Sequence, residues 1–434
     1  MPKVRARNSL PLRVLRHIHE KSRISRSEIA AATGHSPFLT SKLCDQLLQS
    51  GFVSEIGSGD STGGRRPTLL SVSPGLGRVV GVHLGTVNAR VATLDLAGNL
   101  LAFYKAPSRV EQGPEIALPH LVSLIDHTIQ QANVQRSELL GIGIGISGMF
   151  DKASGKTVFW PKVPTWVDVP VRGYLGNHFP ILLEFDDTPR TIAMAERRWG
   201  CAQDSQNLVY LMLGAGIGAA LFLNGRMYTG RDRLAGELGH ITVEENGPLC
   251  SCGNRGCLES LMSATALIAQ AQDAVTRGMS GQLWQLCRGD SKRISLELIV
   301  EAASANDRFA LRLLNEAGSH IGKAIVTLLH LLNPEQIVIG GGMALSAGQL
   351  MLPAIHRVVQ ERALPRVASS LRMQLSELAE VDWARGAALL VIERALGRLY
   401  HNTVEAKKSD GRKLTPARDN HSAESRSERQ VVPS

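Results

Sequence analysis

One histidine and three cysteines near the middle of the chain have a spacing that suits a metal ion. His240 precedes the motif Cys250-x-Cys252-x4-Cys257, which holds three of the six cysteines within eight residues. One imidazole and three thiolates form a closed tetrahedral zinc site, with no open position for an activated water. The sequence therefore predicts a structural Zn2+ at these four residues. Disulfide bonds are the alternative. An odd number of cysteines, with glycines between them, disfavours disulfides.

The N-terminal segment has the pattern of three short helices followed by a hairpin. Leu12, Leu15 and Ile18 stand at helical spacing and predict a first helix, and Ser25-Arg26-Ser27-Glu28 is a capping box for a second helix that Gly34 ends. Ser36-Pro37 starts a third helix that runs to about Ser50. Two strands are expected at 52–56 and 68–72, joined by a Gly/Ser-rich loop. This order is typical of a winged helix-turn-helix.

The charge of the chain is concentrated in this segment. The net charge is +9, and residues 1–78 hold twelve Lys and Arg against five Asp and Glu. Such a localised excess of positive charge favours a polyanion as partner. A basic surface that only contacts solvent would give the same number of charged residues. Because the three helices and the wing accompany this charge, we expect the segment to bind double-stranded DNA. The alternative is a three-helix unit that serves packing or dimerisation. The residues expected to contact DNA are Ser36, Phe38, Thr40, Ser41, Lys42, Arg65 and Arg66.

The role of Phe38 has two interpretations. A thymine methyl group in the major groove is a suitable partner for its ring. The core of the head is equally suitable, and helical periodicity does not decide between the two.

Beyond Val79 the pattern changes to strands that end in glycine-rich turns. Strands are expected at about 79–84, 89–95, 141–147, 208–213 and 336–339. Such turns bring backbone amides close to phosphate groups in α/β proteins. The glycines expected to form nucleotide-like loops are Gly214, Gly216, Gly218, Gly340 and Gly341.

These motifs together resemble the ROK family of repressors and sugar kinases. The resemblance covers about Val79 to Leu396, including Glu237-Leu238-Gly239-His240 and Cys-x-Cys-Gly-Asn-Arg-Gly-Cys-Leu-Glu, which ends at Glu259. The first segment is similar to the DNA-binding end of ROK repressors in its Ser-Arg-x-Glu helix and its Gly-Gly-Arg-Arg-Pro wing. The resemblance implies an α/β, actin-like (ribonuclease H-like) two-lobed sugar kinase fold with an N-terminal winged helix-turn-helix.

The resemblance also implies the domain boundaries. The DNA-binding domain is expected at 8–74. The first lobe is expected at 79–190, with a C-terminal return at about 383–398, and the second lobe with the zinc loop at 191–382. A polar tail from His401 to the end at 434 lacks apolar periodicity, so disorder is expected there.

By the same resemblance, Glu237, His240 and Glu259 stand where relatives contact sugar hydroxyls, and carboxylates suit hydroxyl donors. Ordinary surface or helix-capping acids remain the alternative for Glu237 and Glu259. Lys162 and Asp187 occupy positions where relatives often carry Asn, which suggests a charged sugar derivative such as an amino sugar or a sugar phosphate.

The kinase acids of the family are replaced. His83 stands at the Asp of the first glycine turn, and Thr188 stands eight residues before Glu196, at the position of the catalytic base. A kinase of this type needs that carboxylate to accept the proton of the attacking hydroxyl. A shift of the backbone that places Asp187 in this role would restore a base.

We therefore expect a sugar-responsive, DNA-binding transcriptional regulator, of the repressor type, with a catalytically inactive sugar-kinase-like body. The expected partners are an operator, a sugar or sugar-derivative effector, and further copies of the chain in a dimer or tetramer. We find no signal peptide and no run of eighteen apolar residues, so a cytoplasmic location is expected. The alternatives are an ATP-dependent sugar kinase bearing a DNA-binding head, and a regulator released from DNA by a protein partner.

Overall fold

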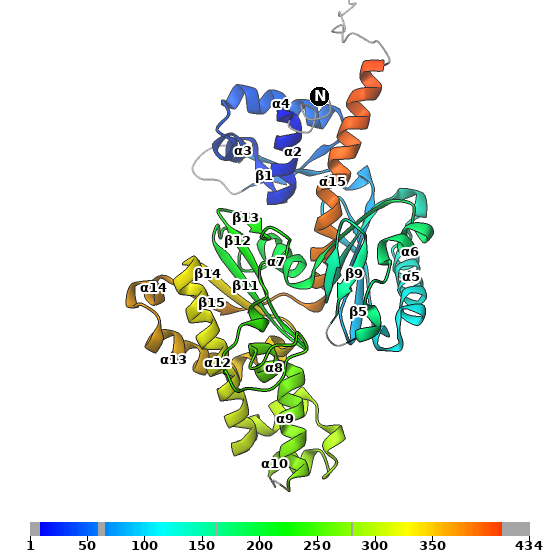
Figure 1. Ribbon diagram of the computed structural model, residues 1–434. Coiled ribbons are helices and arrows are strands. Elements are labelled where there is room, and N and C mark those ends of the chain that lie inside the picture. The colour runs from blue at the N-terminus through cyan, green and yellow to red at the C-terminus, as the bar shows by residue number, and fades with distance from the viewer. Residues whose placement is uncertain (1–8, 60–65, 161–162, 279–280, 410–434) are drawn as a thin grey trace, which may run out of the picture.

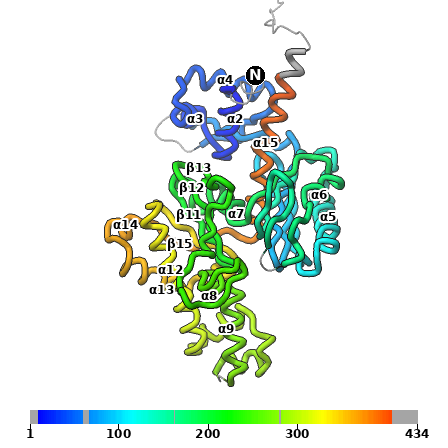
Figure 2. Tube along the Cα trace, viewed as in Figure 1, coloured from blue at the N-terminus to red at the C-terminus, as the bar shows by residue number. Residues whose placement is uncertain are grey.

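A small N-terminal head and two larger lobes make up the computed structural model, which describes residues 9–59, 66–160, 163–278 and 281–409. The head stands at one end, and the two lobes lie below it side by side (Figures 1 and 2). None of the helices in these ranges is long and apolar enough to cross a membrane.

The head has the winged helix-turn-helix order that the sequence predicts. Its helices are α2 (Leu10–Lys21), α3 (Arg26–Thr33) and α4 (Pro37–Gln49), and its antiparallel sheet has the order β1 (Ile24–Ser25), β3 (Thr68–Val72), β2 (Val53–Ser58). The capping box forms as expected, since the Ser25 side chain accepts from the Glu28 amide and Glu28 accepts from the Ser25 amide. Gly34 ends α3 at a φ of 68°, which turns the chain towards α4.

The first lobe is built on a five-stranded sheet of order β10-β7-β4-β5-β6. Strands β4, β7 and β10 are parallel to one another, whereas β5 and β6 continue from β4 as an antiparallel meander. One face is covered by α5 (Pro114–Gln131) and α6 (Val171–His178), and the other by α7 (Thr188–Arg198) and α15 (Glu380–Ser409). The strands of this lobe, including the β8–β9 hairpin, are β4 (Arg78–Leu84), β5 (Asn88–Asp95), β6 (Leu100–Pro107), β7 (Leu139–Ile146), β8 (Met149–Asp151), β9 (Lys156–Phe159) and β10 (Leu182–Asp187).

The second lobe repeats this plan with a sheet of order β13-β12-β11-β14-β15. Its strands are β11 (Leu208–Leu213), β12 (Ile217–Leu223), β13 (Arg226–Tyr228), β14 (Gln336–Gly340) and β15 (Arg372–Leu375). Its helices are α8 (Leu258–Met262), α9 (Ala264–Thr276), α10 (Gln282–Leu286), α11 (Leu296–Ser304), α12 (Arg308–Leu332), α13 (Gly342–Arg362) and α14 (Pro365–Ser370). Short 3-10 turns η1 (Pro74–Leu76), η2 (Val110–Gln112), η3 (Arg136–Glu138), η4 (Pro164–Trp166), η5 (Leu238–His240) and η6 (Ser291–Arg293) connect the elements of the chain.

Helix α15 lies unusually close to the sheet of the first lobe because two strand positions have no side chain. A Cβ atom at Gly81 would lie 2.0 Å from the carbonyl oxygen of Ala384, and one at Gly143 would lie 1.9 Å from that of Ala387. Only glycine fits such a separation, so these two residues fix how closely the helix approaches the strands.

The same helix continues upward to the head (Figure 1). Leu396 and Tyr400 of α15 share one hydrophobic cluster with Leu15 and Phe52 of the head, and the rings of Phe52 and Tyr400 are 5.6 Å apart. Two ion pairs join α2 to the body, Arg16 to Glu393 at 3.0 Å and Lys21 to Asp204 at 3.4 Å. The head therefore packs on the C-terminal half of α15.

The structure corrects the expectation of a disordered tail from His401. Helix α15 continues through His401 to Ser409, because Tyr400 is anchored against the head and the following polar residues extend the helix. The rest of the expected tail, 410–434, lies outside the described residues, as does residue 8 at the start of the expected head.

Candidate functional site

A cleft between the two lobes holds a cavity of about 660 Å³. The C-terminal ends of the parallel strands β4, β7 and β10 meet at this edge of the first sheet, so Thr86, Ser147 and Asp187 line one wall. The second lobe supplies the β11–β12 turn and η5 on the other side. A cavity of this size between two lobes is typical of a small-molecule site.

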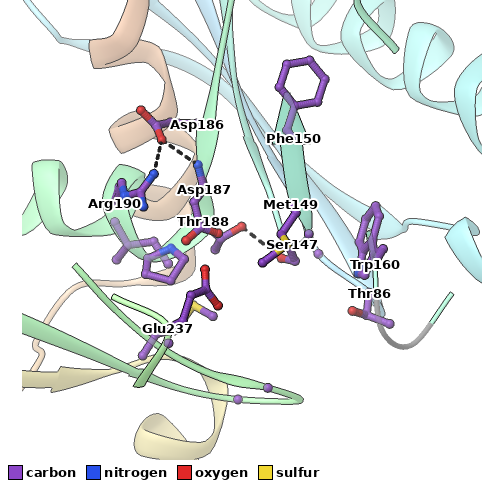
Figure 3. A pocket seen from close by; sticks show the side chains of 18 of the residues that line it. Thr86, Ser147, Met149, Phe150, Trp160, Asp186, Asp187, Thr188, Arg190 and Glu237 are labelled. Carbon is purple, nitrogen blue, oxygen red and sulfur yellow. Dashed lines mark hydrogen bonds and ion pairs between the residues drawn. The ribbon is translucent and has the colours of Figure 1, made fainter. Parts of the chain in front are cut away.

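The predicted ligand contacts come together in this cleft. Asp187, Glu237, His240 and Glu259 all line it. Figure 3 shows Glu237 of the second lobe facing Asp187 and Thr188 of the first. Glu259 is held in place because its Oε2 accepts from the Ile217 amide at 2.8 Å, beside the close-fitting Gly216. The cleft therefore presents carboxyl groups from both lobes to one bound molecule.

Asp187 and Glu237 hold their protons more tightly than ordinary carboxyl groups do. Burial raises the pKa of Asp187 to about 7; the charge of Arg190 opposes this rise, and the nearby carboxyl groups of Glu237 and Asp186 add to it. Burial also raises the pKa of Glu237. Each of these groups, when protonated, can donate as well as accept a hydrogen bond to a hydroxyl.

Asp186 is the centre of a charged network in the wall of the cleft. Its carboxylate accepts from Lys152 Nζ at 2.9 Å, Arg190 Nη1 at 3.1 Å and Arg233 Nη2 at 2.6 Å. Burial alone would raise the pKa of Asp186, but the three cations outweigh it, and the pKa lies below its ordinary value. Lys152 and Arg190 belong to the first lobe and Arg233 to the second, so the network joins the lobes.

Arg190 makes a second connection across the cleft. Its Nη2 donates to the carbonyl oxygens of Arg233 and Ala235 at 2.8 and 2.9 Å. Its side chain is buried, with 3% of the residue exposed. Removal of a buried guanidinium with this many partners would leave a carboxylate and two carbonyls unsatisfied.

Thr188, which stands where the family resemblance implies a catalytic base, carries a hydroxyl group. Thr188 is fully buried at the start of α7, and its Oγ1 lies 3.0 Å from Ser147 Oγ (Figure 3). A threonine hydroxyl is no general base at neutral pH. Asp187 directly precedes the helix and lines the cleft, so it stays the candidate for a substitute base.

His83 stands in a packed cluster of its own at the far end of the cleft. Burial, and then the charge of Arg90, lower the pKa of His83 to about 3, so its imidazole is neutral at pH 7. His83 Nδ1 is 3.4 Å from Arg90 Nη1, and the Arg90 guanidinium lies 4.5 Å from the ring centre of Trp383 in α15. Arg90 is also paired with Glu380. A neutral ring beside a guanidinium supplies none of the negative charge that magnesium requires.

The predicted metal ligands are brought together as the spacing suggests. The ligand atoms of His240, Cys250, Cys252 and Cys257 lie within 4.8 Å of one another. His240 Nδ1 faces Cys250 Sγ at 3.6 Å, while the residue also lines the cleft. Three thiols and one imidazole fit tetrahedral zinc. The loop also depends on Gly256, whose φ of 64° and close approach to the carbonyl oxygen of Glu244 exclude a side chain.

Only some of the residues predicted to contact DNA have exposed, unoccupied side chains. Phe38 and Lys42 are exposed on α4, and Arg66 is exposed at the base of the wing. Ser36 is exposed but caps α4, since its Oγ accepts from the Leu39 amide. Ser41 Oγ accepts from Arg26, which also pairs with Asp45.

Two sequence predictions need correction, and two lie outside the described residues. Thr40 is fully buried, because it lies on the face of α4 that packs into the head, so its placement among the DNA contacts is wrong. Gly340 is the last residue of β14 and packs against Tyr210, whereas the neighbouring Gly341 lines the cleft with Gly214, Gly216 and Gly218. Lys162 and Arg65 belong to ranges that the structure does not describe.

Sequence reasoning missed the network around Asp186. Arg190 had a local signal, because it lies four residues after Asp186, directly past the Asp186-Asp187 pair. Lys152 and Arg233 come from loops far apart in the chain, and no spacing connects them. Arg90 and Trp383 were missed for the same reason, since only the tertiary fold brings β5 next to the start of α15.

These features define the class of protein: an actin-like, two-lobed fold with a small-molecule cleft, a metal-ligand cluster and a helix-turn-helix head. The chain belongs to the ROK family, whose model matches residues 79–394. It is 30% identical over 385 residues to a putative xylose repressor of Caldicellulosiruptor sp. (strain Rt8B.4), a match that covers 89% of this chain and 96% of that protein. An alignment of this length exceeds the chain from Val79 to its end, so it includes part of the head.

Solved structures agree with this assignment. A ROK family transcriptional regulator described as a homologue of the Escherichia coli MLC protein superposes with a TM-score of 0.71 and 26% identity, covering 88% of this chain and 95% of that one. A ROK family glucokinase from Streptomyces griseus, solved with glucose and AMPPNP, gives a TM-score of 0.63 and 24% identity, covering 72% of this chain and 99% of that one. The second match shows the shared fold alone.

The raised pKa of Asp187 predicts a pH-dependent stability. In the unfolded chain this carboxyl group ionises near its ordinary pKa of 3.8, but in the folded chain it keeps its proton up to about pH 7. The wild type therefore loses stability from pH 4 to pH 7, by at most about 1.4 kcal/mol per pH unit from this group, and the loss stops above pH 7. Asp187→Asn removes the effect, so its stability relative to the wild type should rise from pH 5 to pH 7 and then stay level.

Urea unfolding of both proteins at pH 5, 6, 7 and 8 measures this difference. The matched control is Asp168→Asn, which removes an exposed carboxylate outside the cleft. A difference between Asp187→Asn and the wild type that is equal at every pH would contradict the assignment.

Proposed function

We propose that this chain is a sugar-responsive transcriptional repressor whose sugar-kinase-like body binds a ligand without phosphorylating it. The observation that carries the proposal is that one helix, α15, joins a helix-turn-helix head to a cleft in which a hydroxyl group stands where the family resemblance implies the catalytic base. The position of that base holds Thr188, hydrogen-bonded to Ser147. Full-length likeness to a putative xylose repressor supports the same assignment.

The head would bind an operator in the cytoplasm. Helix α4 would enter the major groove with Lys42 towards DNA, and the wing with Arg66 would follow the adjacent minor groove. Two heads in a symmetric oligomer would require an operator with matching half-sites. The solved ROK family transcriptional regulator, which covers 88% of this chain, supports a regulatory role.

The cleft would bind a sugar or a sugar derivative. Asp187, Glu237 and Glu259 offer carboxyl groups to hydroxyls, and His240 offers the ring nitrogen that does not face Cys250. The putative xylose repressor is named for a sugar, which supports this ligand class. Kinase activity is disfavoured because neither Thr188 nor His83 carries the charge that phosphoryl transfer needs.

Ligand binding would reach the DNA through α15. Trp383 in the first turn of this helix lines the cleft, and Tyr400 packs on Phe52 of the head. A ligand changes operator affinity only if it binds one lobe arrangement better than another. The network around Asp186 and Arg190, which spans both lobes, is the part of the cleft most sensitive to such a change.

The metal-ligand cluster would hold one structural zinc ion. Four protein ligands close the coordination sphere, so the ion would fold the loop instead of activating water. When bound, it would also fix His240 in the orientation that presents its second nitrogen to the ligand.

DNA binding and catalysis can be tested on the same preparations. Selection from a random duplex library should yield one preferred sequence for the wild type, and Lys42→Ala should bind it at least tenfold more weakly in fluorescence anisotropy. Arg366→Ala, which removes an exposed positive charge from the second lobe, is the matched control and should bind normally.

A coupled ATP-consumption assay over pentoses, hexoses, amino sugars and their phosphates should show no turnover, while one of these compounds raises the melting temperature.

The opposite results identify the alternatives. Sugar-dependent ATP consumption that Asp187→Asn abolishes would replace the repressor proposal with a kinase. Absence of sequence-selective DNA binding at low and physiological salt would contradict the role of the head.

Removal of a metal ligand tests the zinc proposal. Wild-type protein should contain one zinc per chain by atomic emission, and Cys252→Ser should lose it and become sensitive to proteolysis between Ile241 and Cys257. Cys287→Ser alters a thiol outside the cluster and is the control. Full zinc content in Cys252→Ser, or a stable loop after chelation, would contradict a structural role.

A further inference from the structure

Phe38 is the most exposed large hydrophobic side chain in the described part of the chain. Its exposed fraction is 81%, and it lies in the first turn of α4. The sequence allowed two interpretations, a core position or a contact with DNA. This exposure excludes the core position.

The surroundings of Phe38 show which part of α4 is free to meet a partner. One face of the helix, with Thr40, Leu43, Cys44 and Leu47, is buried in the head. Lys42, one turn after Phe38, and Gln46, two turns after it, are exposed on the same side. This stripe begins with an aromatic ring and continues with a cation and an amide.

Neighbouring polar groups on α4 are already occupied. Arg26 of α3 donates to Ser41 Oγ at 3.2 Å and pairs with Asp45 at 2.8 Å. The Ser36 hydroxyl caps the helix. The N-terminal turn therefore offers a partner mainly the Phe38 ring, with the positive charge of Lys42 beside it.

The position of α4 leaves this stripe accessible. The head packs on α15 through α2 and Phe52, and α4 lies on the side of the head that faces away from the two lobes (Figure 1). A lone exposed apolar residue needs no explanation on an ordinary surface. Here the ring stands where a helix-turn-helix protein places the residues that contact base edges.

We propose that Phe38 reads thymine, by packing its ring against a thymine 5-methyl group in the major groove of the operator. This inference rests on the proposed function of the head and adds the chemistry of one contact. A phenyl ring has no hydrogen-bonding group, so it cannot distinguish the donor and acceptor patterns of the base edges. Among the four DNA bases, thymine alone presents a methyl group in the major groove. Lys42, with its flexible ammonium group, would contact a phosphate or a guanine one helical turn further along α4.

The test removes the methyl group from the DNA instead of altering the protein alone. The preferred duplex is selected with the wild type, and each thymine in it is replaced in turn by deoxyuridine. Burial of one methyl group is worth about 0.8 kcal/mol, so wild-type affinity should fall about fourfold at one thymine per half-site. Phe38→Ala should bind the parent duplex more weakly and show no further loss at that position.

Phe38→Leu and Gln49→Ala are the matched variants. Leucine keeps an apolar contact, so sensitivity to deoxyuridine should persist in part. Gln49 is exposed at the other end of α4, and its replacement should leave the fourfold effect unchanged. Because Phe38 is exposed, Phe38→Ala should melt at the wild-type temperature.

The outcomes separate this inference from the function on which it rests. If the wild type selects no sequence, the proposed DNA-binding function fails. If the wild type selects a sequence but no deoxyuridine substitution weakens its binding, the proposed methyl contact is wrong while the repressor proposal stands. The same holds if deoxyuridine weakens the binding of Phe38→Ala as much as that of the wild type. A change in oligomeric state of Phe38→Ala without this coupling would assign the ring to contacts between heads.

Discussion

The close contact between α15 and the first-lobe sheet is the constraint on which the rest of the structure depends. Gly81 and Gly143 let the helix backbone lie directly on the strands, and any side chain there would collide with a helix carbonyl. With its N-terminal turns fixed in this way, α15 holds Trp383 at the cleft and Tyr400 against the head. A displacement of the lobes that moves α15 must therefore move the surface on which the DNA-binding head rests.

The chemistry of the cleft suits the binding of a polar small molecule. Thr188 and His83, which stand where the family resemblance implies acids, are both held in packed, hydrogen-bonded surroundings. The carboxyl groups of Asp187, Glu237 and Glu259 line the cleft, and Asp187 keeps its proton up to about pH 7. Meanwhile the cations around Asp186 connect the two lobes across the cleft. A cleft whose polar lining joins two lobes is suited to report whether a ligand is present.

Features set by neighbouring residues could be predicted from the sequence, whereas features assembled from distant segments could not. The metal ligands lie within one short loop, and the capping box at Ser25 and the glycine turns are local, so their spacing was sufficient. The network of Lys152, Arg190 and Arg233 around Asp186 was missed because it joins three segments. Thr40 was misassigned because the sequence pattern did not separate the exposed face of α4 from the buried one. The polar composition after His401 concealed the end of α15, which continues there because its preceding turns are packed against the head.

The central claim, that the cleft and the head are coupled, is tested most directly by thermodynamic linkage. The sugar that stabilises the protein most is titrated calorimetrically into free protein and into protein saturated with its preferred duplex, for the wild type and for Tyr400→Ala. The account predicts that the duplex lowers sugar affinity by the same factor, at least fivefold, by which the sugar lowers duplex affinity, and that this factor approaches one in Tyr400→Ala. Equal sugar affinity in free and DNA-bound wild-type protein would contradict it.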